Sequence, residues 1–372
     1  MQVESVERSD RARRRADPAS NEPSPVARSA RPALVRIGRS MGLVTTLVAS
    51  ACSSSPPSNP PPAERVGAAE VQQVKAIGSG LAASFDAAPS KDGATVYFTA
   101  ITEMSGAVYS VAATGGTPTQ LADGFLAPVQ VVSSLDGSKV YVADAGDTDG
   151  KAVGLISAVA VSGGAKTALT QSKGYGARGL DVVKLDGKEW IYFVGSDPSD
   201  GQPGVFRMEE GGSVETVKKG APLVEPSCVA VAQNGDVFVS DARASGDRGA
   251  VHKLSGTNAS FLIENIVIGN PGGVALSFDE KFLLVSAHEA GTSKSQVYRI
   301  ELATGMSGIF KQGIDQNTES AGLHRAHEKD LYAWADFGEP RISPSIPGVS
   351  GSAGQSTGHV YLVCTKQEAQ CQ

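Results

Sequence analysis

The chain has 372 residues, of which 33 are Lys or Arg and 39 are Asp or Glu. The composition argues against a mainly helical protein, because the chain has 43 glycines, 20 prolines and only 6% aromatic residues. It has no long apolar pattern with a period of 3.6 residues, so short strands joined by turns are favoured. Nine arginines and five acidic residues lie before Met41, so the rest of the chain has 24 basic and 34 acidic residues and a net charge of about −10. This charge argues against nucleic-acid binding through phosphate neutralisation.

The first segment, 1–51, is an arginine-rich lead that ends in an export signal. Its mostly apolar run, 41–51, is about half of the ~20 residues that a membrane-spanning helix needs. The sequence VRIGRS precedes this run and the small residues ASA close it, as in a cleaved signal. Cys52 follows, so the segment resembles a bacterial lipoprotein signal, in which this cysteine is acylated and becomes the new N-terminus. An ordinary cleaved signal followed by a chance cysteine is the alternative.

The second segment, 52–70, reads SSSPPSNPPPAERVGAAE after its cysteine and has few bulky apolar residues. Such a stretch can bury little surface, so we expect a solvated tether between a lipid anchor and a folded body. The expected location is the outer membrane or periplasm of a bacterium.

Residues 71–372 contain a repeat. Turn signals recur at intervals of about 44 to 50 residues, within the range of repeat architectures. Each lies between two apolar strands, where Asp-Gly and Asn-Gly predict type I′ hairpin turns. The signals are Asp92, Asp136, Asp186, Asn234, Asp279 and Glu328.

Each repeat continues with a third strand, and the first five have a fourth after a glycine-bearing turn. The sixth repeat stops after GHVYLV, and the unpaired strand VQQVKAIG at the other end of the domain can complete it. The pattern therefore predicts an all-β fold, a six-bladed β-propeller of four-stranded antiparallel blades closed by the N-terminal strand. A β-sandwich is the alternative, but it does not require a fixed period.

The segment NPGGVALSFDEKFLLVSAHEAGTSKSQVYRI resembles a blade of the NHL, SMP-30 (gluconolactonase-like) and TolB-like six-bladed propellers. The resemblance covers residues 71–365. Its blade motif is structural, so it implies the fold more strongly than any chemistry.

The two faces of such a propeller differ in the length of their loops. The longer connections, DAGDTDGKAVG, SDPSDGQPG, DARASGDRG, AHEAGTSKS and 337–357, all fall on the face where the innermost strands begin, which we call the long-loop face. Residues that approach the innermost strands should ring the central channel there. The candidates for ligand binding are Arg178, Glu225, Asn270 and Glu319, with Asp144 and Asp241 expected near the same rim.

The resemblance to SMP-30-like enzymes implies a possible metal site. In that family a glutamate, an asparagine and an aspartate hold the catalytic metal, and Glu225, Asn270 and Asp241 are residues of these types. Oxygen ligands from different blades suit calcium. The alternative is that these side chains are solvated loop acids or structural bridges.

The cysteines and histidines predict little chemistry of their own. Cys364 and Cys371 are candidates for a disulfide in an oxidising compartment, and Cys228, inside an apolar strand, is expected to be a buried free thiol. His324 and His327 span a strand and its turn, so we expect core or surface histidines rather than a ligand pair.

Two functions remain open from the sequence. The first is an exported, lipid-anchored, monomeric propeller that binds a protein, peptide or glycan through its long-loop face. The second is a metal-dependent lactonase or esterase of the SMP-30 type that uses acids at the central channel.

Overall fold

The computed structural model describes residues 71–81, 84–101, 105–146, 153–256, 258–269, 272–288, 295–309, 320–336 and 358–365. Contacts divide the chain into two units, 1–57 and 58–372, and all described residues belong to the second. Within them there is no helix long and apolar enough to cross a membrane.

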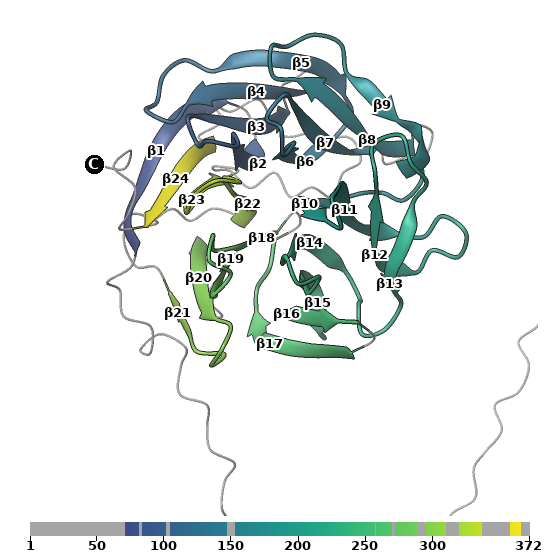
Figure 1. The fold of residues 1–372 in the computed structure, drawn as a ribbon. Coiled ribbons are helices and arrows are strands. Elements are labelled where there is room, and N and C mark those ends of the chain that lie inside the picture. The colour runs from purple at the N-terminus through teal and green to yellow at the C-terminus, as the bar shows by residue number, and fades with distance from the viewer. Residues whose placement is uncertain are drawn as a thin grey trace, which may run out of the picture. The chain divides into compact units, whose positions relative to one another are not determined.

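The described residues form six four-stranded antiparallel sheets, or blades, arranged around a centre (Figure 1). Blade 1 contains β2 (Ser84–Pro89), β3 (Thr95–Ile101), β4 (Gly106–Ala112) and β5 (Thr119–Phe125). Blade 2 contains β6 (Pro128–Ser133), β7 (Lys139–Gly146), β8 (Val153–Ala160) and β9 (Thr167–Leu169). Blade 3 contains β10 (Gly179–Leu185), β11 (Lys188–Ser196), β12 (Pro203–Met208) and β13 (Glu215–Lys219).

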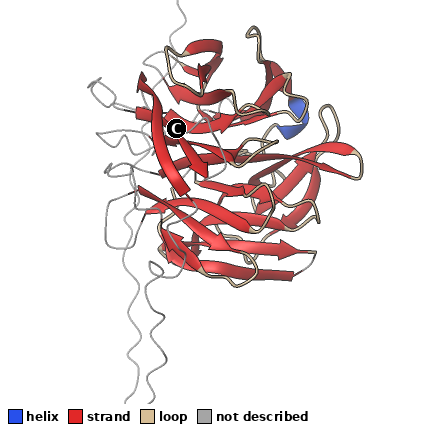
Figure 2. Cartoon of the chain, turned by 60° about the vertical axis from the view of Figure 1, so that its left-hand side comes forward, coloured by secondary structure: helices blue, strands red, loops and turns tan. Residues whose placement is uncertain are grey.

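The remaining blades follow the same order from the centre outward. Blade 4 contains β14 (Pro226–Val231), β15 (Val237–Ser245), β16 (Arg248–Ser255) and β17 (Asn258–Ile266). Blade 5 contains β18 (Gly273–Leu276), β19 (Phe282–His288), β20 (Ser295–Glu301) and β21 (Ser307–Ile309). Blade 6 contains β22 (Ser320–Arg325), β23 (Leu331–Asp336), β24 (Gly358–Thr365) and β1 (Val71–Leu81). A 3₁₀ turn at Thr170–Ser172 is the one helical element among the described residues (Figure 2).

The ring closes as the repeat predicts. The N-terminal strand β1 pairs antiparallel with β24, with Val74 opposite Val363 and Gly78 opposite Val360 (Figure 1). The last blade is thus built from both ends of the domain. Because β1 pairs with β24, the outer edge of β24 is not left open. The predicted six-bladed, all-β architecture is confirmed, and the β-sandwich alternative is wrong.

Burial decreases from the centre of each blade outward. Every residue of β2, β6 and β14 is buried, whereas most residues of β13 and β17 are exposed or half-buried. Each innermost strand packs against the innermost strands of the two neighbouring blades. This packing explains their almost continuous runs of small and apolar residues.

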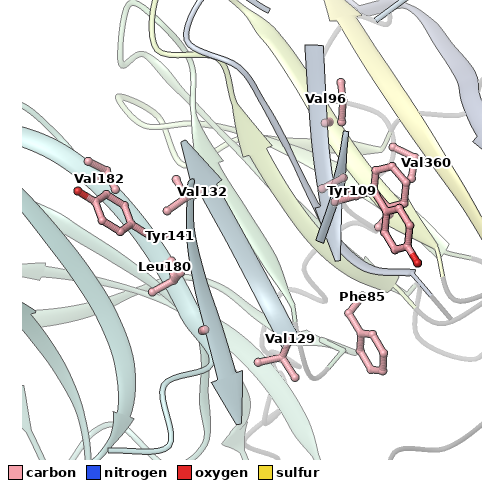
Figure 3. Packing of buried hydrophobic residues seen from close by; sticks show 14 of the residues in the cluster. Phe85, Val96, Tyr109, Val129, Val132, Tyr141, Leu180, Val182 and Val360 are labelled. Atoms are coloured by element: carbon pink, nitrogen blue, oxygen red, sulfur yellow. The ribbon is translucent and has the colours of Figure 1, made fainter. Parts of the chain in front are cut away.

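The main hydrophobic core lies between neighbouring blades rather than inside a single sheet. Figure 3 shows Tyr109 of blade 1, Val132 and Tyr141 of blade 2, and Leu180 of blade 3 among its members, all of which are buried. Val360 of β24 belongs to the same cluster, so the closing blade shares this core. The stability of the ring therefore depends on the contacts between blades.

The turns between first and second strands differ in part from the type I′ prediction. Only Asp186 and Gly187 have positive φ at both central positions, 52° and 79°. At Asp92 the turn is longer: Gly93 alone has positive φ, and Asp92 Oδ1 accepts hydrogen bonds from the Ser90 hydroxyl (2.7 Å) and the Ala94 N–H (3.0 Å). Equivalent serine-to-aspartate bonds form at Asp136 and Asp279. A serine two residues before the aspartate therefore indicates this longer turn.

Candidate functional site

In blade 2 an aspartate at the end of the second strand fixes the start of the innermost strand. Asp144 of β7 accepts hydrogen bonds from the backbone N–H groups of Leu126 (3.0 Å) and Ala127 (2.8 Å), just before β6 begins. It also accepts one from the N–H of Gly146 (3.1 Å). This carboxylate is therefore a structural bridge, and Leu126, whose backbone it holds, is 51% exposed.

Blade 4 repeats the arrangement with Asp241 of β15. Its carboxylate accepts hydrogen bonds from the N–H groups of Val224 (2.8 Å), Glu225 (2.9 Å) and Arg243 (3.2 Å). The buried His252 ring lies close by, with Nε2 3.6 Å from Asp241 Oδ2. Burial alone would raise the pKa of Asp241, but the neighbouring imidazole and the three N–H groups outweigh it and lower the pKa. Val224, in the position equivalent to Leu126, is 53% exposed.

On the long-loop face, beside Val224, two arginine guanidinium groups lie close to one glutamate carboxylate. Arg243 Nε lies 3.0 Å from Glu225 Oε2, and Arg178 Nη1 lies 3.8 Å from Glu225 Oε1. The backbone N–H of Arg178 donates to Val194 O (3.0 Å), which fixes this residue at the approach to β10. The described side chains where blades 3 and 4 meet thus sum to one net positive charge, whereas residues 41–372 carry about −10.

These side chains line a cavity of about 260 Å³ between blades 3 and 4, which we call the arginine cavity. Its described lining consists of Arg178, Gly195, Ser196, Pro203, Val224, Glu225, Pro226 and Arg243. Gly195 is needed in this wall, since a Cβ there would overlap the carbonyl oxygen of Tyr175. The cavity thus combines charged groups with proline, valine and serine walls.

Buried hydrogen bonds also join the innermost strand of blade 2 to an adjacent blade and to the segment before the opposite blade. The side chain of Gln130, in β6 of blade 2, donates from Nε2 to Gly272 O next to blade 5 (3.0 Å). Its Oε1 accepts the N–H of Leu180 in blade 3 (2.9 Å). Both contacts are buried, so one amide ties three blades together across the axis.

An ion pair joins the first and last blades at the same depth. Asp86 Oδ2, in β2, lies 2.9 Å from His324 Nε2, in β22, and also accepts the N–H of Val131 in blade 2 (2.7 Å). Asp86 is fully buried and His324 is 4% exposed. Burial by itself lowers the pKa of His324, but the charge of Asp86 and its hydrogen bond raise the pKa overall. Gly322 leaves room for this pair, because a Cβ there would overlap Asp86 Oδ1.

Two further groups lie on innermost strands, the half-buried Asp181 and the fully buried Cys228. Asp181 of β10 accepts the N–H of Val231 (2.7 Å) in blade 4, and burial raises the pKa of its carboxyl to about 6. The predicted buried free thiol at Cys228 is confirmed, and burial raises its pKa to about 12. At neutral pH this thiol is protonated and unreactive.

The predicted site residues thus divide into several groups. Arg178 and Glu225 come together in the arginine cavity, and Asp144 and Asp241 lie at the rim as structural bridges. Four of the other predicted residues lie outside the described residues: Asn270, Glu319, Cys52 and Cys371. Of Cys364 only the backbone in β24 is described. The calcium site and the disulfide therefore stay predictions.

His324 and His327 do not act as a pair, as expected. His324 binds Asp86, whereas His327 Nε2 lies 2.8 Å from Ser133 O. Among the described residues no group of three His, Cys, Asp or Glu side chains is arranged to hold a metal ion.

Arg243 and the buried polar groups of the innermost strands were not predicted from the sequence. The segment DARASGDRG, expected to be a loop, extends the hairpin of β15 and β16, with Ser245 opposite Arg248. This extension places Arg243 against Glu225. A signal for the polar groups was present, because Asp86, Gln130 and Asp181 interrupt otherwise apolar innermost strands.

Neither a protein-family model nor a curated protein matches the chain. Among solved structures, it is similar to the gluconolactonase XC5397 from Xanthomonas campestris, at 13% identity over 80% of this chain and 91% of that chain, with a TM-score of 0.53. A chain of the nidogen–laminin complex matches at 15% identity over 65% of this chain and 84% of that chain, with a TM-score of 0.51.

TolB from Acinetobacter baumannii matches at 15% identity over 62% of this chain and 55% of that chain, with a TM-score of 0.47. Identities this low show a likeness of fold alone, and the two structures with TM-scores above 0.5 carry it. The likeness to gluconolactonase-like propellers predicted from the sequence is therefore confirmed for the fold.

Proposed function

We propose that this chain is an exported, lipid-anchored, monomeric propeller that binds a partner through its long-loop face, over blades 2 to 4. A closed ring of sheets offers a rigid support for loops at its rim. The binding region comprises the arginine cavity and the two exposed apolar residues Leu126 and Val224.

The observation that carries this proposal is the way these apolar side chains are held. Leu126 and Val224 are both more than half exposed, yet their backbone N–H groups are fixed by the buried carboxylates of Asp144 and Asp241. Fixing an exposed apolar group before binding reduces the entropy lost on association. Such an arrangement suits recognition of another molecule.

The same contacts favour binding over a calcium-dependent lactonase. A metal-ligating carboxylate needs free oxygen lone pairs. Asp241 already accepts three backbone hydrogen bonds, and Glu225 faces two guanidinium groups. A calcium ion here would have to displace Arg243 from a 3.0 Å contact.

Changing the two exposed apolar residues to aspartate is expected to abolish capture of the partner. The double variant Leu126→Asp and Val224→Asp places charge at surface positions, so folding should be unaffected while the contact surface is lost. The measurement is affinity capture from envelope extracts with the full chain immobilised, followed by identification of the retained molecules.

The control is Phe278→Asp, which alters an equally exposed apolar residue (55%) in the turn between β18 and β19 on the opposite face. It should retain the partner at the level of the unchanged chain. If the opposite-face variant loses the partner and the double variant keeps it, the long-loop face is not the binding surface.

The anchor is expected at Cys52. Acylation there should give an intact mass larger than that of the chain beginning at residue 52, and partition into detergent. The variant Cys52→Ser removes the acylated thiol and should lose both properties. A Cys52→Ser protein that still partitions into detergent would contradict the lipid anchor.

A further inference from the structure

We infer that the arginine cavity binds the free C-terminal carboxylate of a peptide. This inference rests on the proposed function and names the ligand chemistry for one part of the long-loop face. It rests on the unused hydrogen-bond donors of Arg178 and Arg243, on the net charge of the described side chains around them, and on the residues that line the cavity.

Both arginines retain hydrogen-bonding capacity. Among the described residues the Arg178 guanidinium makes no hydrogen bond, and its nearest carboxylate oxygen, on Glu225, is 3.8 Å away. Arg243 uses Nε for Glu225 at 3.0 Å, and its side chain is 69% exposed. Since a guanidinium has five N–H donors, several remain for a planar anion that can accept two at once.

The charge balance favours a single carboxylate. Among the described residues that line the cavity, two guanidinium groups and the Glu225 carboxylate sum to one net positive charge. A singly charged ligand neutralises it, whereas a phosphate group with two charges adds repulsion from Glu225. Because the rest of the body carries a net charge of about −10, anions are repelled elsewhere on the surface.

The size and walls of the cavity indicate what the carboxylate is attached to. At about 260 Å³ the cavity is smaller than the ~300 Å³ lower limit of typical drug-sized sites, so it accepts one terminal residue rather than a long segment. Val224 and the two prolines, Pro203 and Pro226, offer apolar contact for a side chain. No aromatic ring lies among the described lining residues, which disfavours a sugar acid stacked on a ring.

The test uses N-acetylleucine as a probe for a peptide C-terminus and N-acetylleucinamide as its neutral counterpart. Calorimetric titration of the full chain at low ionic strength should detect N-acetylleucine with a millimolar dissociation constant, and at least tenfold weaker binding of the amide. Arg178→Met and Arg243→Met should each weaken N-acetylleucine at least tenfold. Glu225→Gln should bind it several-fold more tightly, because a competing negative charge is removed.

The matched control is Lys219→Met, which removes a cation of the same face that is already held by Asp197 (2.8 Å) and Asp200 (3.0 Å). It should leave N-acetylleucine binding unchanged. Unchanged thermal unfolding of each arginine variant would show that lost binding is not lost folding. Equal or tighter binding of inorganic phosphate or galacturonate would overturn the peptide assignment, as would equal binding of the amide.

The two experiments distinguish failure of this inference from failure of the proposed function. If N-acetylleucine does not bind while capture still depends on Leu126 and Val224, only the ligand assignment is wrong. If capture is also unaffected by the double variant at these positions, both are wrong.

Discussion

A chain that lacks Val71–Leu81 is expected to unfold at a clearly lower temperature than the full chain and to aggregate. The deletion removes β1, which pairs with β24 from Val71 opposite Thr365 to Leu81 opposite Gly358. The buried Ile77 leaves the main core, and Val74 leaves the cluster that contains Trp334. With the lost backbone hydrogen bonds, we expect a destabilisation of at least ~5 kcal/mol.

Aggregation is expected because the outer edge of β24 then has no partner. An unpaired, apolar strand edge can pair with the same edge of another molecule. The measurement is thermal unfolding combined with light scattering, for the deletion and the full chain side by side.

The matched control deletes 53–67, a stretch of similar length in the predicted tether. Since that stretch has few bulky apolar residues, its loss should leave the midpoint unchanged. Equal midpoints for the β1 deletion and the full chain would contradict the role of β1 in closing the ring.

The sequence predicts the blades well because their signals are local. Each turn lies a few residues from the strands it joins, and the regular spacing from Asp92 to Glu328 shows how many blades there are. Even the pairing of β1 with β24 follows from counting strands, since the sixth repeat lacks one. The turn type was harder to predict, because the hydroxyl of Ser90 competes with the I′ geometry that Asp-Gly alone suggests.

The site is less predictable because its contacts are long-range. Gln130 and the Gly272 carbonyl are 142 residues apart, and they meet only because the ring has a particular diameter. No local pattern contains that information. Arg178 and Glu225 could be predicted as neighbours, since both precede innermost strands of adjacent blades. Arg243 could not, because its position depends on the hairpin extending past the expected strand end.

Asp86→Ala is expected to destabilise the fold by about 3–5 kcal/mol, which lowers the unfolding midpoint by roughly 10 °C. The substitution leaves the His324 ring and the N–H of Val131 without their shared acceptor in a fully buried position. It also removes the hydrogen bonds that join blade 1 to blade 2 and to blade 6, the blade that closes the ring. The exposed Asp123→Ala, in β5 of the same blade, should change stability by less than ~0.5 kcal/mol and is the control.

The pH dependence of stability shows whether the contribution of the Asp86–His324 pair comes from its charges. Because the pKa of His324 is raised in the fold, its contribution is fully present below the unfolded value of 6.5 and is lost as pH rises through the folded pKa. The half-buried His327 has a lowered pKa and the opposite sign, but its contribution is constant once the pH exceeds 6.5. Asp181, with a pKa of about 6, likewise contributes no further change well above that pH.

Chemical denaturation between pH 7 and pH 8 therefore isolates the pair, because this range lies below the pH at which the Cys228 thiol ionises in the unfolded chain. The stability of the unchanged chain should fall across this range, and the fall should be smaller in His324→Gln, which keeps a hydrogen-bond donor but cannot become charged. A His324→Gln variant with the same fall in stability as the unchanged chain would show that Asp86 and His324 join the blades through a neutral hydrogen bond. The large loss expected in Asp86→Ala would then come from unpaired buried donors and not from charge.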